Sequence, residues 1–170
     1  MEKGTVYWIT GLSGAGKTTI GKALYNEIKK ERDNVVLLDG DVLRETFGND
    51  LGYTKEDRFQ CAMRYGRICR MLSEQDITVI CCTISMFNEV REWNRGHIEN
   101  YVEVYLRVPI EILKQRDQKQ LYSGIKNGTS MDVVGMDLEL ELPEHSEIVI
   151  DNTGEKSIED TVEEIMAYRK

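Results

Sequence analysis

Short apolar runs that are typical of buried β-strands recur along the chain, and segments of helical periodicity separate them. Each run is rich in β-branched, aromatic or other apolar residues. The runs span residues 6–9, 35–38, 77–84, 102–108 and 147–150. Strands that alternate with helices form parallel sheets, because each helix crosses over one face and returns the chain to the same end of the sheet. The pattern therefore predicts an α/β fold with about five parallel strands and helices on both faces.

The segments between these runs carry apolar residues three and four positions apart, as one face of a helix requires. In the first such segment that face contains Ile20, Ala23, Leu24 and Ile28. Capping and first-turn residues mark the later helix starts, among them Thr54, Pro109 and Ser157. Further helices are thus predicted over 42–47, about 55–75, 88–99, after Pro109 and after Ser157.

Residues 116–135 depart from this alternation. They are polar, contain glycines and have no apolar stripe that could face a core. A segment of this kind can close over a bound ligand, so we predict a lid there. No repeat or Pro-rich linker interrupts the chain, and we therefore expect a single domain over residues 1–170.

A glycine-rich loop joins the first predicted strand to the first predicted helix. It matches the phosphate-loop pattern G-x-x-x-x-G-K-[ST] at every fixed position, and the strand and helix beside it make a chance match improbable. In such loops backbone N–H groups and the helix start surround a phosphate, the Lys reaches the β- and γ-phosphates, and the hydroxyl ligates Mg²⁺. We expect this ATP-binding role for Gly11, Leu12, Ser13, Gly14, Ala15, Gly16, Lys17, Thr18 and Thr19.

Two carboxylates, Asp39 and Asp41, follow the second strand in a D-G-D turn. Ligands bind at the carboxyl ends of parallel strands. A phosphoryl transfer needs acidic groups that position Mg²⁺ and accept the proton of the attacking hydroxyl. An aspartate that merely caps the next helix is the alternative interpretation. Beside a phosphate loop we favour the catalytic interpretation.

Composition and charge narrow the class of protein. The chain is 41% hydrophobic and 31% charged, as in soluble globular proteins, and no apolar run approaches the roughly 18 residues of a membrane span. The first strand begins so early that we expect no signal peptide, and four cysteines without C-x-x-C spacing point to free thiols in the cytoplasm. The net charge of −8 argues against nucleic acid as a partner.

Motifs of other phosphate-loop classes are missing or misplaced. The chain has no N-K-x-D motif, and its D-x-x-G matches at 132–135 and 151–154 come too late to be a GTPase switch. A short chain with a possible lid and a D-G-D turn fits a small-molecule kinase better.

The sequence resembles the adenylylsulfate kinase family, which phosphorylates the 3′-hydroxyl of a nucleotide-linked sulfate. Matching segments occur in family order over nearly the whole chain: residues 9–19, 38–44, 51–54, 57–58, 84–85, 115–117, 121–122 and 135–137. The resemblance implies a P-loop kinase with Mg·ATP as donor, a small nucleotide as acceptor, and a homodimer.

The resemblance also implies roles for individual residues. Asp41 matches the carboxylate that engages the acceptor hydroxyl, while Asp39 matches the one near metal and phosphates. Arg116, in the lid, would approach the nucleotide. On the acceptor side it implies two binding arginines, a stacking aromatic residue, and a serine that some members phosphorylate; these match Arg44, Arg58, Tyr53 and Ser85. For Ser85 a simple strand-end hydroxyl is an equal alternative.

Departures from the family pattern lie among the acceptor residues. Cys61 stands where the family has Asn, and Met63 where it has Arg. In the predicted lid, Met131 replaces a Lys and Val133 replaces the Phe that closes an aromatic sandwich on the adenine. These exchanges remove a hydrogen-bonding amide, two cations and a stacking ring.

An intact ATP half beside an altered acceptor half predicts a different acceptor. A branch that resembles this family, found with bacterial capsule synthesis, phosphorylates cytidine diphosphoramidate, and a single stacking residue suits a pyrimidine. True adenylylsulfate kinase activity, which makes 3′-phosphoadenylylsulfate, is the alternative. A non-catalytic nucleotide sensor is the alternative of another class, and the intact Lys17, Thr18, Asp39 and Asp41 argue against it.

Overall fold

The computed structural model of the protein describes residues 3–116 and 140–168. Within these residues the chain forms a five-stranded sheet with the strand order β2-β3-β1-β4-β5, and every neighbouring pair is parallel. The strands are β1 (Val6–Thr10), β2 (Val35–Asp39), β3 (Thr78–Cys82), β4 (Tyr101–Arg107) and β5 (Ile148–Asp151). The predicted α/β class and the number of strands are confirmed.

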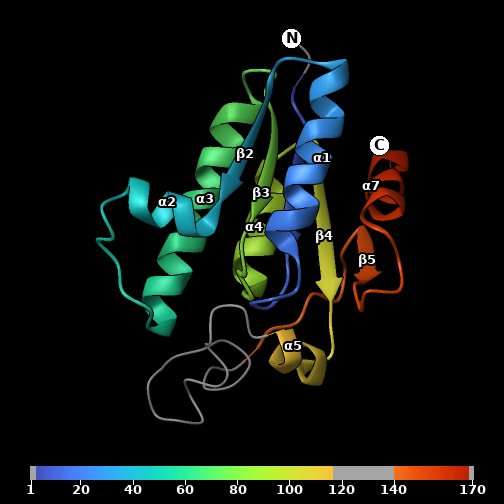
Figure 1. Ribbon diagram of the computed structural model, residues 1–170. Coiled ribbons are helices and arrows are strands. Elements are labelled where there is room, and N and C mark those ends of the chain that lie inside the picture. The colour runs from blue at the N-terminus through green and yellow to red at the C-terminus, as the bar shows by residue number, and fades with distance from the viewer. Residues whose placement is uncertain (1–2, 117–139, 169–170) are drawn as a thin grey trace.

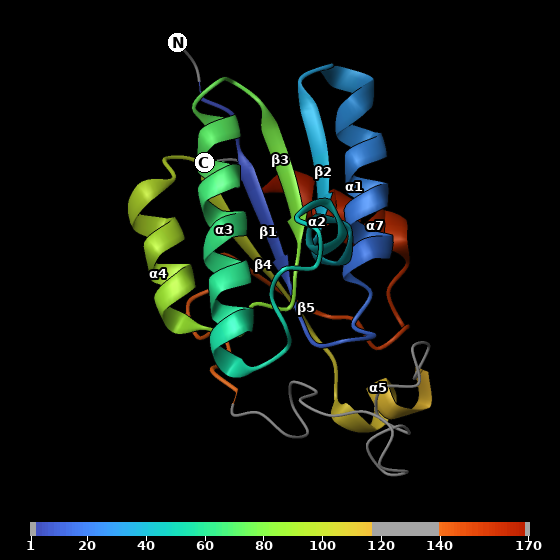
Figure 2. The same cartoon turned by 90° about the vertical axis from the view of Figure 1, so that its left-hand side faces the viewer.

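Helices cover both faces of this sheet (Figures 1 and 2). One layer consists of α1 (Lys17–Glu31) and α7 (Ile158–Ala167), and the opposite layer of α3 (Lys55–Ser73) and α4 (Asn88–His97). The short helix α2 (Gly40–Thr46) directly follows β2, and α5 (Ile110–Arg116) follows β4 beyond the carboxyl ends of the strands (Figure 1). Of the predicted lid, 116–135, only Arg116 lies within the described residues.

Alternation along the strands divides the core between the two helix layers. On β1, Val6 and Trp8 pack with the α3 and α4 layer, whereas Tyr7 and Ile9 pack with the α1 and α7 layer. This follows from the period of two in a strand, which turns successive side chains to opposite faces. Trp8 is completely buried. Burial of each large apolar side chain contributes about 1.5–3 kcal/mol, so the central strand anchors both layers.

Two details of the strands differ from the predicted pattern. The third strand ends at Cys82 rather than Ile84, and the left-handed backbone of Ser85 (φ 42°) lies in the turn that follows. The fourth strand carries a fully buried carboxylate, Glu103, whose burial the apolar pattern did not predict. Tyr101 donates a hydrogen bond to its Oε2 at 3.1 Å and Ser146 donates to its Oε1 at 2.7 Å. These donors satisfy a charge that would otherwise be costly to bury.

In the part of the chain that the structure describes, none of the helices combines the length and the apolar character needed to cross a membrane.

Candidate active site

The phosphate loop lies between the end of β1 and the first turn of α1, at the carboxyl edge of the sheet. Gly14 and Gly16 adopt positive φ angles of 83° and 97°, a region where a Cβ would be strained. The Nζ of Lys17 lies 2.9 Å from the Leu12 carbonyl oxygen, to which it donates. The ammonium group is thereby held over the loop, where the motif places it to meet a bound phosphate.

Asp39 connects this loop to the second strand. Its Oδ2 accepts a hydrogen bond from the Thr18 hydroxyl at 2.7 Å, and its Oδ1 accepts one from the Asp41 backbone N–H at 3.0 Å. Asp39 is therefore the N-cap of α2, as the alternative interpretation held, and it also lies beside the phosphate-loop hydroxyl. Asp41 is exposed in the first turn of α2. Both carboxylates thus stand at the edge of the sheet where the loop opens.

Oxygen ligands at this edge fit Mg²⁺. The hydroxyl of Thr18 and the carboxylate of Asp39 are hard oxygen donors within 2.7 Å of each other. The described residues contain no group of three or more His, Cys, Asp or Glu side chains that could form a closed metal cage. Mg²⁺ in phosphoryl-transfer sites takes one or two protein oxygens and completes its shell with phosphates and water. These two residues match that requirement.

Asn152 is a candidate site residue that the sequence analysis missed. Its Nδ2 donates to the Ala15 carbonyl at 2.8 Å, so the end of β5 holds the phosphate loop from the far side. Arg116 bridges the same two segments, since it donates to the carbonyls of Gly14 at 3.2 Å and Asn152 at 2.7 Å. A Cβ on Gly16 would lie 2.6 Å from Asn152 Nδ2. The position of Asn152 just after a parallel strand was the signal that could have found it.

Three of the predicted acceptor residues come together between α2 and α3. The guanidinium of Arg44 lies 4.3 Å from the centre of the Tyr53 ring and that of Arg58 lies 5.3 Å from it. Arg44 donates to the carbonyls of Leu51 at 3.2 Å and Gly52 at 2.8 Å, while Arg58 donates to the Tyr53 carbonyl at 2.8 Å. Tyr53 remains 56% exposed. The arrangement presents an aromatic ring and two cations to solvent, which suits an anionic nucleotide.

Cys61 and Met63 do not share this exposure. Both are buried in the core between α3 and the sheet. Cys61 lies against Tyr65, whose hydroxyl donates to the Gly40 carbonyl in the D-G-D turn at 3.1 Å. Burial, and then the neighbouring Cys61, raise the pKa of Tyr65 well above its usual range, so this phenol stays protonated and remains a donor. Cys61 therefore lies beneath the turn that carries the carboxylates.

Ser85 lies where β3 gives way to α4. It is 6% exposed, and among the described residues its Oγ has no hydrogen-bond partner. The buried Arg91 donates to its carbonyl at 3.3 Å, which fixes the turn. Met131 and Val133 of the predicted acceptor set lie outside the described residues.

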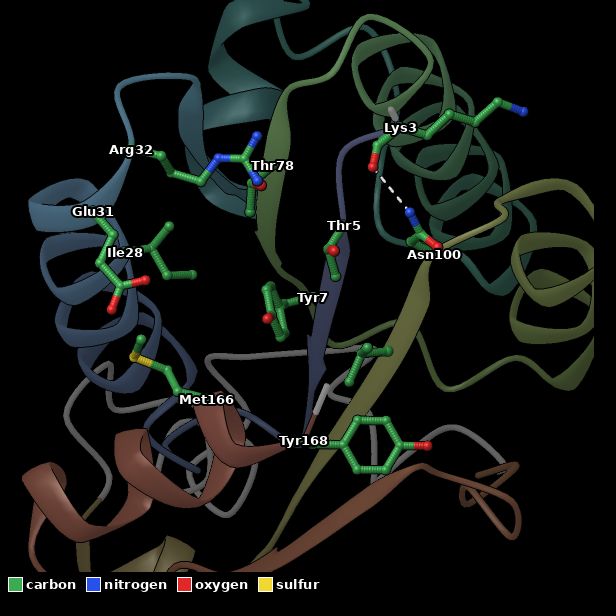
Figure 3. Close-up of a pocket in the computed structure, with 11 residues that line it drawn as sticks. Lys3, Thr5, Tyr7, Ile28, Glu31, Arg32, Thr78, Asn100, Met166 and Tyr168 are labelled. Carbon is green, nitrogen blue, oxygen red and sulfur yellow. Dashed lines mark hydrogen bonds between the residues drawn. The ribbon is translucent and has the colours of Figure 1, made fainter. Parts of the chain in front are cut away.

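A separate cavity of about 330 Å³ opens at the other end of the sheet (Figure 3). It is lined at the amino ends of β1, β3 and β4 by Thr5, Thr78 and Asn100, and it lies between the last turns of α1 and α7. None of the predicted site residues that the structure describes lines it. The candidate active site is instead the carboxyl edge that carries the loop and both aspartates.

Comparisons with known proteins agree with this geometry. The adenylylsulphate kinase family model matches residues 3–151. A cytidine diphosphoramidate kinase of Campylobacter jejuni subsp. jejuni serotype O:2 is 42% identical over 161 residues, which are 95% of this chain and 94% of that protein. An adenylyl-sulfate kinase of Halothermothrix orenii is 33% identical over 167 residues, 98% of this chain and 90% of that protein.

A solved structure agrees as well. The Mycobacterium tuberculosis APS kinase CysC in complex with AMPPNP and APS superposes with a TM-score of 0.89 and 26% identity, covering 98% of each chain. With the sequence match over most of its length, the shared fold and the loop geometry, this chain belongs to the adenylylsulfate kinase family of ATP-dependent phosphotransferases.

Proposed function

We propose that this kinase phosphorylates the ribose 3′-hydroxyl of cytidine diphosphoramidate. The observation that carries the proposal is the 42% identity to the Campylobacter enzyme of that name, which extends over 95% of the chain. The acceptor surface supports it. Tyr53 is 56% exposed, and Cys61 and Met63, which differ from the family pattern, are buried in the core.

The charge on this surface suits a diphosphate-linked nucleoside. The guanidinium groups of Arg44 and Arg58 lie 4.3 Å and 5.3 Å from the centre of the Tyr53 ring, so a base bound at this ring would have its phosphates close to a guanidinium. Stacking of a base on one aromatic ring contributes about 1–3 kcal/mol. Charge-assisted hydrogen bonds from arginine to phosphate would fix the orientation of the acceptor.

The transfer itself needs few groups. Lys17 and the loop N–H groups bind the β- and γ-phosphates of ATP, while Asp41 orients the acceptor hydroxyl and accepts its proton. The bond from O3′ to the γ-phosphorus forms as the bond to the β,γ-bridging oxygen breaks, and ADP leaves with that electron pair. Thr18 and Asp39 would hold a Mg²⁺ ion, which supplies charge neutralisation between the phosphates when bound. We also expect a homodimer, as the family resemblance implies.

The test is a side-by-side assay of ATP consumption with cytidine diphosphoramidate and with adenylylsulfate. We expect a kcat/KM for the cytidine compound at least about tenfold higher, which corresponds to about 1.4 kcal/mol of discrimination. The Asp41→Asn variant serves as the control for contaminating kinases. Efficient turnover of adenylylsulfate together with poor turnover of the cytidine compound would refute the proposal and leave the alternative acceptor. Mass analysis of the product identifies the phosphorylated position.

A further inference from the structure

The second turn of α1 approaches the sheet unusually closely at Gly21. A Cβ added to this glycine would lie 2.3 Å from the Sγ of Cys82, a distance that no pair of such atoms tolerates. The same Cβ would also lie 3.4 Å from Leu37 and 3.6 Å from Ile80, so the space is closed on three sides. The sulfur of Cys82 therefore occupies the volume that a side chain at position 21 would need.

Cys82 lies directly below the catalytic machinery. It ends β3, and its register partners are Asp39 on β2 and Ile9 on β1. Its thiol donates to the backbone carbonyl of Lys17 over 3.3 Å. Burial, reinforced by Asp39, raises the pKa of Cys82 to about 12, so the thiol keeps its proton at neutral pH.

Two contacts therefore hold the start of α1 to the sheet. On the solvent side the Thr18 hydroxyl donates a hydrogen bond to Asp39. On the core side the Cys82 thiol donates one to the Lys17 carbonyl. The helix can lie this close to β3 because the Sγ of Cys82 faces Gly21, which has no Cβ. Any change in that separation moves Lys17 and Thr18 relative to Asp39, because all three are attached to these two elements.

We propose that Cys82 is a positioning residue of the ATP site and that it acts as a matched pair with Gly21. The pair fixes the height of the α1 N-terminus above the sheet and hence the placement of the phosphate-loop lysine and hydroxyl. The proposal rests on the kinase reaction of the family and not on which nucleotide is the acceptor.

The pair can be tested by adding a methyl group at position 21 and removing the sulfur at position 82, first singly and then together. Gly21→Ala introduces the clash and should raise the Kd for a non-hydrolysable ATP analogue with Mg²⁺ about tenfold or more, since displacement of a site by a fraction of an ångström is enough. Cys82→Ala removes the sulfur and should raise this Kd about threefold. In the double variant the new methyl fills the space that the sulfur left. Its Kd should return to within about threefold of the wild-type value.

Two matched controls separate positioning from general destabilisation. Gly66→Ala creates an equally close contact, 2.3 Å from Asn94 Oδ1, on the opposite face of the sheet. Cys69→Ala removes another completely buried thiol there. Both should lower the melting temperature and leave the Kd of the ATP analogue unchanged.

Cys82→Ser adds a separate readout, because it keeps a donor for the Lys17 carbonyl and should bind the analogue more tightly than Cys82→Ala. If Gly21→Ala yields no folded protein, rescue is scored on the solubility and Kd of the double variant. A double variant no better than Gly21→Ala, or a Gly66→Ala variant with the same loss of affinity, would overturn the proposal. Since binding of the ATP analogue needs no acceptor, this outcome is independent of the acceptor assay.

Discussion

The proposed donor and acceptor sides of the candidate active site are built differently. The donor side is held by bonds between residues distant in sequence: Thr18 to Asp39 spans 21 positions, Arg116 to Gly14 spans 102, and Asn152 to Ala15 spans 137. The acceptor side is held by hydrogen bonds between residues that are close in sequence. Arg44 bonds to a carbonyl eight positions away, and Arg58 to one five positions away.

The difference explains which half of the site can change. A substitution in the donor half disturbs several strands at once, because the sheet itself positions the groups. A substitution between α2 and α3 alters an exposed ring and two arginines that bond mainly within their own segment. A substitution at these exposed residues should therefore leave the phosphate loop in place.

The largest effect on activity should come from Asp41→Asn, which tests whether this carboxylate accepts the proton of the acceptor hydroxyl. The amide cannot accept the proton of the acceptor hydroxyl, so kcat should fall about 10²–10⁴-fold. The Kd for ATP should stay within about twofold, because Asp41 is exposed and lies outside the phosphate loop. Steady-state kinetics and calorimetry measure the two quantities. A kcat that survives within a few-fold would show that Asp41 is not the base.

The second test addresses the acceptor side alone. Tyr53→Ala removes the exposed ring and should raise the acceptor KM about 5–150-fold, which corresponds to the loss of about 1–3 kcal/mol of stacking. Tyr53→Phe keeps the ring and is the matched control. The ATP KM and the melting temperature should not change in either variant. An acceptor KM unaffected by Tyr53→Ala would mean that the base does not stack there.

The third test addresses the donor side through Asn152. Asn152→Ala removes the hydrogen bond to the Ala15 carbonyl, which should cost about 0.5–1.5 kcal/mol of stability. The loosened loop should raise the Kd for ATP about 3–10-fold while the acceptor KM stays constant. Asn26→Ala, at an exposed position on α1, is the control. Equal changes in both substrates would contradict a role confined to the donor side.

The smallest effect is a pH dependence on the acceptor side. Hydrogen bonds from Arg64 hold the pKa of Asp50 below its usual 3.8 in the folded protein. The pair therefore stabilises the fold above that value, and the contribution disappears as the pH falls through the lower folded-state pKa. The melting-temperature difference between wild type and Asp50→Asn should be constant near neutral pH and shrink as the pH is lowered through and below 3.8. It should be small throughout because the pair is exposed. A difference that is constant with pH would exclude this linkage.

Features that depend on local sequence were predictable. The period of the apolar runs predicted the strands and helices, and the phosphate-loop motif and the D-G-D turn picked out two segments that the structure joins through Thr18 and Asp39. Contacts across the fold were not predictable. Asn152 reaches the loop through the order of strands, and the burial of Glu103 depends on Ser146 from a distant segment.

Cys61 shows the limit of residue matching. Its place in the family pattern predicts an acceptor contact, whereas the structure places it in the core below the D-G-D turn. The match says which position changed but not which way the new side chain points. Whether it touches the acceptor stays a prediction.

The strand order has a consequence for the order of events during biosynthesis. β3 stands between β1 and β2, yet it is the last of the three to leave the ribosome. A nascent chain that ends at residue 75 already carries the phosphate loop and both aspartates but lacks the strand that sets their spacing. Closing this long-range arrangement carries an entropic cost that no local contact offsets. We therefore expect no high affinity for ATP before β3 inserts, so that nucleotide binding requires an assembled sheet centre.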